Sequence, residues 1–351
     1  MTEQALVPAA AAGATIETFS FGDDVSVISG RESWGYFDGL WRNGDWYEPP
    51  MPFHGLAKAY LLSPHHQSAI GLKLNLLRRH FVPSRWLDAN THDRLVLDYL
   101  QMGQFFAEPI MNLGGRLLRY QHSPALHTRV GVTPGEFFWV RPDPNGVSIG
   151  AQGIHKFARP LCHVQEPDVA QEVYGLPQWL AALQSALLNE AANLFRRRYY
   201  INGGHAGYVF YASEGTLSDV DAKAIREKLM QAKGRGNFKN LFIHAPTGKK
   251  DGIQILPLAE VAAKDEFAGI KNITRDDMLA AHRVPPQLLG VVPQNNGGFG
   301  DIRSAADLFF INEITPLMTK VRELNAHAGL TVVDYRDYVP MMPAGAAAPA
   351  R

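Results

Sequence analysis

The pattern of apolar and polar positions predicts two long helices that flank a compact insert. In the first, 177–200, apolar residues recur at three- and four-residue spacing and form a stripe along one side. Pro177 suits its first turn, where backbone N–H groups have no partner within the helix. The second runs from about 260 to 282, either unbroken or interrupted near 269–274, and the two prolines at 285–286 forbid its continuation.

The insert between these helices reads as a small α/β unit. Its pattern predicts strands at 207–211, 240–244 and 252–256. Ser218 is placed as the N-cap of a helix between the first and second strands, because its hydroxyl can accept a hydrogen bond from the first turn.

A loop and a third helix follow the second long helix. The loop, 291–300, is uncharged and rich in Gln, Asn and Gly, which makes it flexible and able to form hydrogen bonds. The helix, 301–325, is expected to kink at Pro316. Its apolar face carries Ile302, Ala305, Leu308, Phe309, Ile311 and Ile314.

The N-terminal half predicts an α+β block. A helix capped by Ser63 runs through Leu77, and another begins at 93–99. Strand patterns occupy 103–111, 116–121 and 137–140. The first residues are low in complexity, and the following stretch to Pro52 is rich in aromatic residues without clean periodicity. That stretch is either an arm that packs on a neighbouring copy or an irregular lobe of the same domain.

Composition and charge narrow the class of protein. A chain of 351 residues with 46% hydrophobic residues is long enough for two or three domains and forms a core. The net charge is zero, but the range 196–250 holds eleven Lys or Arg against four Asp or Glu. This asymmetry indicates either an anionic partner or a solvated loop, and the triplet Arg196-Arg197-Arg198 is either a helix cap or a polyanion contact.

Targeting signals and cysteine usage indicate a reducing cytoplasm. Cys162 is the single cysteine, so no internal disulfide forms, and we expect it to be a buried apolar residue. No apolar run is long enough to span a membrane, and the N-terminus lacks the basic start of a signal peptide.

The sequence lacks a convincing enzymatic motif. The pairs His65-His66 and His122/His127 have no supporting Cys or carboxylate at ligand spacing, so neither a metal nor a cofactor is expected. The stretch 247–250 fails as a phosphate loop, because position 243 is Ile rather than Gly and Lys249 is followed by Lys. We therefore expect a protein that is not an enzyme.

Several motifs together resemble one family. They occur in order and span about 64 to 325, and by them the chain resembles the portal (head-to-tail connector) proteins of tailed bacteriophages, most closely the PBSX-type branch of contractile-tail temperate phages. The motifs are Glu166-Pro167, Tyr174-Gly175-Leu176-Pro177, Leu180-Ala181-Ala182-Leu183-Gln184-Ser185, Gly215-Thr216-Leu217-Ser218-Asp219 and Val284-Pro285-Pro286-Gln287-Leu288-Leu289-Gly290.

The resemblance implies an α+β portal fold that assembles into a ring, with a specific division of the chain. The implied parts are an N-terminal arm (1–51), a wing domain (52–175), a stem helix (176–202), a clip domain (203–257), a second stem helix (258–283), a tunnel loop (284–300), a kinked tunnel helix with a short crown (301–328) and a C-terminal strand and tail (329–351).

The resemblance also implies a function and partners. A ring of twelve copies would stand at one capsid vertex, where the terminase large subunit packages double-stranded DNA through it and the neck and tail attach. Further implied partners are the major capsid, scaffold and head-completion proteins, and the implied location is the virion, with assembly in the host cytoplasm.

Three groups of residues follow as candidate sites. The tunnel-loop residues expected to line the DNA channel are Gln294, Asn295, Asn296, Gly297, Gly298 and Phe299. The clip residues expected to contact terminase or neck proteins are Lys233, Arg235, Lys239, Lys249 and Lys250. The stem cations Lys264, Lys271 and Arg275 either face the channel or pair with acids such as Glu260 and Asp276.

Two other functions stay open. A nucleic-acid-processing enzyme with a basic DNA-binding lobe at 196–250 would need a catalytic cluster, which the spacing does not provide. A capsid or tail structural protein without DNA contact would leave the Gln/Asn/Gly loop without a purpose.

Overall fold

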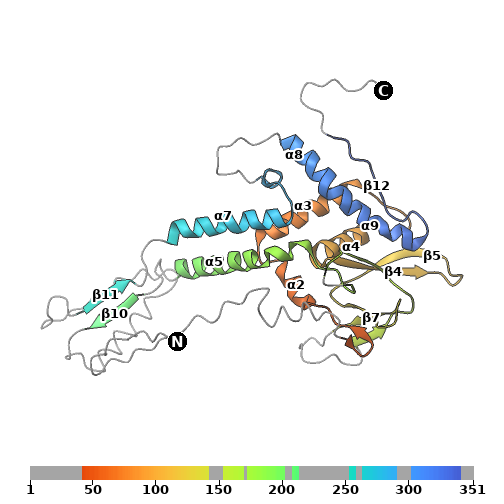
Figure 1. Cartoon of the computed structure of the whole chain (residues 1–351), viewed down its shortest axis with the longest axis horizontal. Helices are drawn as coiled ribbons and strands as arrows, with labels where there is room; N and C mark the ends of the chain where they lie inside the picture. The colour runs from red at the N-terminus through yellow and green to blue at the C-terminus, as the bar shows by residue number, and fades with distance from the viewer. Residues whose placement is uncertain are drawn as a thin grey trace, which may run out of the picture.

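The computed structural model describes residues 42–141, 153–169, 172–201, 208–212, 253–257, 263–290 and 302–340. Figure 1 shows a body of helices and sheets at one end of an elongated molecule, from which two long helices run side by side toward a pair of strands. The helices are α2 (Phe53–Ala59), α3 (Pro64–His80), α4 (Ala89–Met102), α5 (Leu183–Ile201), α7 (Ala263–Ala281), α8 (Ile302–Phe309) and α9 (Thr315–Ala328).

Short helical turns and strands complete the described elements. The turns are the 3-10 helices η2 (Gln178–Ala182) and η3 (Pro286–Leu289) and the π-helical turn η4 (Phe310–Ile314). The strands are β1 (Arg42–Asn43), β2 (Trp46–Tyr47), β3 (Phe81–Val82), β4 (Gln104–Met111), β5 (Leu117–Ser123), β6 (Thr128–Val130), β7 (Phe137–Val140), β8 (Ile154–Lys156), β9 (Cys162–Gln165), β10 (Tyr208–Ala212), β11 (Ile253–Pro257) and β12 (Asp334–Tyr335).

Local capping explains where the first two long helices of the body begin. The Ser63 hydroxyl accepts a hydrogen bond from the backbone N–H of His65 (3.3 Å), which confirms the predicted N-cap of α3. Asp88 caps α4 in the same way through the N–H of Thr91 (2.9 Å). Helix α4 therefore begins before the predicted start at Asp93.

The body is built around two three-stranded antiparallel sheets. The first has the order β5-β4-β9, with α4 and α9 packed against it, and the second has the order β6-β7-β8. The larger core joins α3, α4 and α9 to β4 through fully buried residues such as Leu95, Phe105 and Leu324. Cys162 is also buried there, as predicted. A second core surrounds Trp179, at the root of the long helices.

The two long helices confirm the main sequence prediction. Helix α5, preceded by η2, matches the predicted 177–200, and α7 matches the predicted return helix. Of the two alternatives for 269–274, the structure shows the unbroken helix, because α7 continues through this range. The hydroxyl of Thr274 donates to the carbonyl of Ile270 (2.8 Å), which satisfies this polar group within the helix.

Strands β10 and β11 pair in antiparallel register between the far ends of the long helices. They match the predicted strands 207–211 and 252–256. The predicted helix at Ser218 and the strand at 240–244 lie outside the described residues.

The last long helix contains an irregular turn close to Pro316, and the predicted kink at this proline stays a prediction. The turn is π-helical and ends at Ile314, and the hydroxyl of Thr315 donates to the carbonyl of Phe310 there (3.1 Å). The extra residue of a π-turn rotates the preceding helix by about 100°. The predicted apolar face is accordingly divided, with Phe309 and Ile314 buried and three residues exposed: Ile302, Leu308 and Ile311.

The described part of the aromatic N-terminal stretch packs on its own chain. Trp46, on the hairpin of β1 and β2, is buried and contacts Phe138 with the ring centroids 5.5 Å apart. For residues 42–47 this supports the lobe rather than the arm. Residues 1–41 lie outside the described part of the chain.

The joint between the body and α5 is a contact between two glycine backbones. Gly103 ends α4 with φ of 74°, and a Cβ there would lie 2.3 Å from the carbonyl carbon of Leu176. A Cβ on Gly175 would lie 2.0 Å from the carbonyl oxygen of Gly103. The chain leaves the body toward η2 and α5 at this point, so the direction of α5 depends on this close approach.

We predict that Gly103→Ala and Gly175→Ala each lower the thermal unfolding midpoint, because backbone atoms cannot move aside cheaply. The expected loss is about 2–4 kcal/mol. The control is Gly71→Ala inside α3, where a Cβ meets no atom within 4 Å. Helix propensity should raise the stability of that variant by about 0.5–1 kcal/mol. Equal midpoints for all three variants would contradict the close approach.

Candidate functional site

Helices α5 and α7, which are the predicted stem helices, pack against each other in antiparallel directions. Ala182 and Ala186 contact Met278 in a narrow apolar seam. Further along, the side-chain amide of Asn189 donates to the hydroxyl of Thr274 (3.0 Å), and both residues are buried. A buried hydrogen bond of this kind favours one register of the two helices, since any slip leaves the buried amide of Asn189 without this acceptor.

The structure places the predicted stem cations unevenly. Arg275 donates to the carboxylate of Asp276 (2.8 Å) and to the side chain of Asn272 (3.3 Å), as the pairing alternative expected. Lys271 is exposed on the same helix. The side chain of Lys264 lies outside the described part of the structure. Whether any of these cations faces a channel stays a prediction.

The other two groups of candidate residues are not placed. The clip cations Lys233, Arg235, Lys239, Lys249 and Lys250 and the tunnel-loop residues 294–299 all lie outside the described residues.

The structure does place both flanks of the loop. On the N-terminal side α7 ends, and Leu288 and Leu289 pack against the main core. On the C-terminal side α8 leads into the π-turn.

A buried ion pair lies between these two flanks. The Nζ of Lys73, on α3, is 2.6 Å from Oε1 of Glu313, in the π-turn, and the two side chains are only 4% and 6% exposed. The second carboxylate oxygen, Oε2, lies 3.3 Å from the guanidinium of Arg283, just after α7. Burial lowers the pKa of Lys73, and the adjacent carboxylate of Glu313 opposes that shift.

A chain of neutral hydrogen bonds lies beside the ion pair. The amide nitrogen of Gln101 donates to the carbonyl of Leu56 (2.6 Å), so its oxygen accepts from Nε2–H of His66 (3.0 Å). The Nδ1 of His66 then accepts from Nε2–H of His282, at the end of α7 (2.9 Å). Desolvation lowers the pKa of His66 to about 4 and that of His282 to about 2, so both rings are neutral at pH 7.

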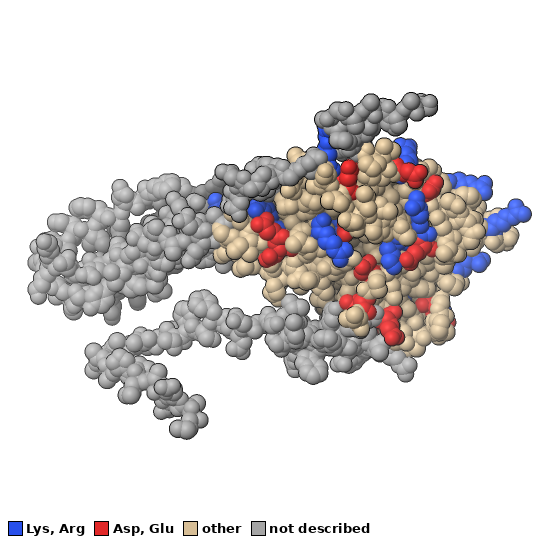
Figure 2. All heavy atoms as spheres, turned by 45° about the horizontal axis from the view of Figure 1, so that its top comes forward, with Lys and Arg blue, Asp and Glu red and all other residues tan. Residues whose placement is uncertain are grey.

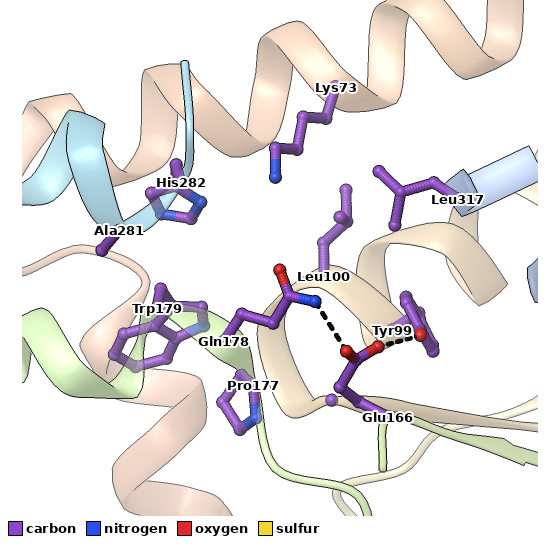
Figure 3. Close-up of a pocket in the computed structure, with 11 residues that line it drawn as sticks. Lys73, Tyr99, Leu100, Glu166, Pro177, Gln178, Trp179, Ala281, His282 and Leu317 are labelled. Carbon is purple, nitrogen blue, oxygen red and sulfur yellow. Dashed lines mark hydrogen bonds between the residues drawn. The ribbon is translucent and has the colours of Figure 1, made fainter. Parts of the chain in front are cut away.

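A small cavity separates the ion pair from the root of the stem (Figure 3). Its volume is about 20 Å³, which is room for one or two water molecules. Glu166 lies on its wall, accepting hydrogen bonds from the hydroxyl of Tyr99 and from the amide of Gln178 (2.6 Å). These side chains on its wall are thus paired with one another and link the end of β9, α4 and η2.

Sequence analysis missed Lys73, Glu313 and the His66–His282 pair. A signal existed for the first, because Lys73 occupies the same stripe of α3 as the buried Ile70 and Leu77. A lone cation at an apolar position indicates a buried partner. That partner, Glu313, is far away in the sequence, so pattern alone could not identify it.

Neither a metal-ligand cluster nor a membrane-spanning helix occurs in the described residues. Within them, no group of three or more His, Cys, Asp or Glu side chains could hold a metal ion. Among the helices in this part of the chain, none is long and apolar enough to cross a membrane.

Comparison with known proteins identifies the class. Residues 83–330 match the model of the phage portal protein family. The chain belongs to this family, whose members form the connector at a vertex of the capsid and are structural proteins of the virion.

Two curated relatives extend the match over most of the chain. The chain is 44% identical over 328 residues to the probable portal protein of Escherichia phage P2, covering 93% of each chain. It is 32% identical over 286 residues to the probable portal protein of Haemophilus phage HP1, covering 81% of this chain and 82% of that one. The PBSX-type branch stays a prediction.

Solved structures show the same fold at low identity. A chain in the neck of the native gene transfer agent particle, computed with C12 symmetry, gives a TM-score of 0.55 at 17% identity and covers 84% of this chain and 86% of that one. An HK97-family phage portal protein from Corynebacterium diphtheriae gives 0.53 at 14% identity, covering 80% and 93%. The predicted α+β portal fold is thereby confirmed.

The neutral histidine pair predicts a pH dependence of stability. In the unfolded chain both rings have a pKa near 6.5, above the folded values. The contribution of the two neutral rings to the free energy of unfolding is therefore fully present above pH 6.5 and is lost as the pH drops toward 4. Each histidine contributes about 1.4 kcal/mol per pH unit in this range. We expect His282→Gln to flatten the decline of the unfolding midpoint between pH 6.5 and 4.5. The exposed His155→Gln variant should retain the full decline, and an identical slope for His282→Gln would contradict the assignment.

The buried ion pair predicts that a single substitution destabilises the fold and that a second one restores most of the lost stability. Lys73→Met leaves the Glu313 carboxylate buried beside a hydrophobic side chain, and should cost about 3–5 kcal/mol. Lys73→Met combined with Glu313→Leu removes both charges and should restore most of the unfolding midpoint. Chemical denaturation of the three proteins checks this, and a double variant as unstable as the single one would refute it.

Proposed function

We propose that copies of this chain form a closed ring at the capsid vertex, and that double-stranded DNA passes through its channel past residues 291–300. The elongated shape supports this, because the stem pair α5 and α7 extends from the body like a segment of a stalk (Figure 1). The similarity to a neck chain in a particle with C12 symmetry is consistent with twelve copies.

Exposed apolar residues on the stem support contacts between copies. Helix α5 carries a second apolar stripe away from the seam with α7, formed by Leu187, Leu188 and Leu194, which are 39%, 50% and 46% exposed. Helix α8 adds Leu308, and the π-helical turn η4 adds Ile311. In a ring, each copy meets its neighbours through two different surfaces, which suits such stripes on separate helices.

The loop at 291–300 is the feature that suits passage of DNA. A strongly basic lining would bind the phosphate backbone tightly and slow its movement. This loop is uncharged, and Gln294, Asn295 and Asn296 can form transient hydrogen bonds while its glycines allow movement. The single observation that carries the proposal is that both flanks of this neutral loop are fixed to the body, at the end of α7 and at the π-turn.

In this proposal the chain forms the channel and does not supply the energy that moves the DNA. Since its sequence has no phosphate loop, the terminase large subunit would drive the DNA. The basic clip residues Lys233, Arg235, Lys239, Lys249 and Lys250 would contact terminase during packaging and neck proteins afterwards. The body would contact major capsid and scaffold proteins. On the face shown in Figure 2, acidic and basic residues of the body are interspersed, so that face favours protein contacts over DNA binding.

Deletion of residues 294–298 tests the proposal. We expect the variant to form rings and to be incorporated into capsids, but to lose packaged DNA, because each copy contributes the channel contact. DNA per particle is measured in a complementation assay, and rings are counted by electron microscopy.

The control for this experiment is deletion of Leu113 and Gly114, in the exposed turn between β4 and β5, away from α7 and α8. That variant should package normally. Full packaging and retention by the variant without residues 294–298 would refute a role of the loop in the channel.

A further inference from the structure

We infer that the stem of one copy docks on the stem of the next, with Ile273 of α7 inserted between Leu187 and Leu194 of the neighbouring α5. The inference rests on the ring of the proposed function and names the surfaces that join its copies. The residues that form the contact all lie in the described parts of α5 and α7. The contact can be tested in purified rings, without DNA.

The stem is apolar on its outside at a distance from the body where its inside is polar. Near the body, Ala182 and Ala186 pack against the buried Met278. Further out, the two helices meet through the buried hydrogen bond between Asn189 and Thr274. At about that level, large apolar side chains face solvent on both helices, namely Leu187, Leu188 and Leu194 on α5 and Ile273 on α7. A row of exposed apolar side chains is typical of a surface that binds a protein.

The two exposed surfaces lie on roughly opposite sides of the helix pair. At about 100° per residue, Leu187, Ala191 and Leu194 are centred about 140° around α5 from its seam with α7. Ile273, which is 62% exposed, lies about 100° around α7 from the buried Thr274. Because the helices are antiparallel, these rotations lead to different sides of the pair. A ring needs this arrangement, since each copy offers one surface to the copy before it and another to the copy after it.

The two surfaces also match in height along the stem. Asn189 of α5 is bonded to Thr274 of α7, and the helices run antiparallel, so Ile273 lies one residue further from the body than this bond. A rotation about a ring axis that runs along the stem leaves this height unchanged. At this height the neighbouring α5 presents Leu187 on one side of Ile273 and Leu194 on the other.

The small residue at position 191 provides the space for Ile273. Packed helices insert one side chain into a hole formed by four residues of the facing helix. On α5 such a hole, with i, i+3, i+4, i+7 spacing, consists of Leu187, Glu190, Ala191 and Leu194. Ala191 is exposed and is the smallest of the four. On α7, a Cβ on Gly269 would meet no atom within 4 Å, so the helix surface one turn before Ile273 is open to close approach.

A second copy of this chain is therefore the partner that fits the exposed stripe of α5. The same chain carries a hole on one side of its stem and a single protruding side chain on the other. The two are at equal height, so one rotation repeated around the ring fills every hole. The stem then gains between copies the apolar contacts that its own inner surface lacks beyond the root.

Disulfide cross-linking in purified rings tests the contact. The variant carries Ala191→Cys and Ile273→Cys, and it is oxidised and run on a denaturing gel without reductant. Within one chain these positions face different sides of the stem, so a bond between them joins two copies. The native Cys162 is buried, and desolvation raises its pKa to about 12, so it stays reduced. We expect a ladder of covalently linked copies.

The matched control combines Gln184→Cys with Ile273→Cys. Gln184 is exposed on the same side of α5 as Ala191, but it lies about 10 Å nearer to the body. A disulfide requires Cα atoms within about 7 Å of each other, so this pair should give no ladder. Each single-cysteine variant should give none either. Equal ladders from the two pairs would contradict the matched heights.

A substitution at the protruding residue provides a second measurement. Ile273→Asp should shift the protein from rings to single chains at the same concentration, as measured by light scattering. The unfolding midpoint of the single chain should stay the same, because this side chain is exposed there. The control is Leu118→Asp on β5, where the leucine is 52% exposed in the body, and it should retain the rings.

The inference and the proposed function fail separately. Rings that give no ladder from positions 191 and 273, or rings that persist in Ile273→Asp, would overturn the inference and leave the ring itself in place. A parent protein that forms no ring would contradict both. Normal packaging by the variant without residues 294–298 would count against the role of the loop and would leave the contact between stems intact.

Discussion

The carboxylate of Glu313 is the point on which the central part of this structure depends. It is buried, both of its oxygens are paired, and its partners come from α3 and from the end of α7. Because a buried charge without a partner is strongly unfavourable, these three elements must meet whenever the chain folds. The neighbouring hydrogen bonds of His66 and His282 add a second link between α3 and α7. The stem is thus joined to the body by polar contacts that specify one arrangement.

The long helices have two kinds of surface, an interface fixed within the chain and apolar faces that the single chain leaves uncovered. The seam between α5 and α7 is narrow and fixed in register by Asn189 and Thr274, whereas the outer faces of α5 and α8 are apolar and uncovered in the single chain. A ring requires this division, because copies must keep their own shape while meeting neighbours. The fold and the family are shown by comparison, and the roles of the loop and the clip are proposals built on them.

Sequence reasoning located elements well where the signal is local. The Ser63 cap, the stem helices and the strands β4, β5 and β7 follow from capping residues and periodicity close in the chain. It failed where the outcome depends on distant partners. The sequence left open whether α7 is interrupted at 269–274, and it is continuous because Thr274 bonds within the helix and to Asn189. The π-turn, which the sequence did not predict, is stabilised by a contact from α3. Sequence reasoning identified only some strands of each sheet, since β6, β8 and β9 lack a strong local pattern and gain their stability from neighbouring strands.

The glycine joint constrains how this architecture can vary. Where Gly103 meets Gly175, the backbones touch directly and no side chain lies between them to be enlarged or trimmed. Most contacts between structural elements can change gradually, because a larger side chain on one element can be compensated by a smaller one on the other. The contact between Gly103 and Gly175 cannot change in this way. Small substitutions at this contact therefore cannot adjust the tilt of α5 relative to the body step by step. Rings of different width would then have to arise from the surfaces between copies, while the shape of each copy stays the same.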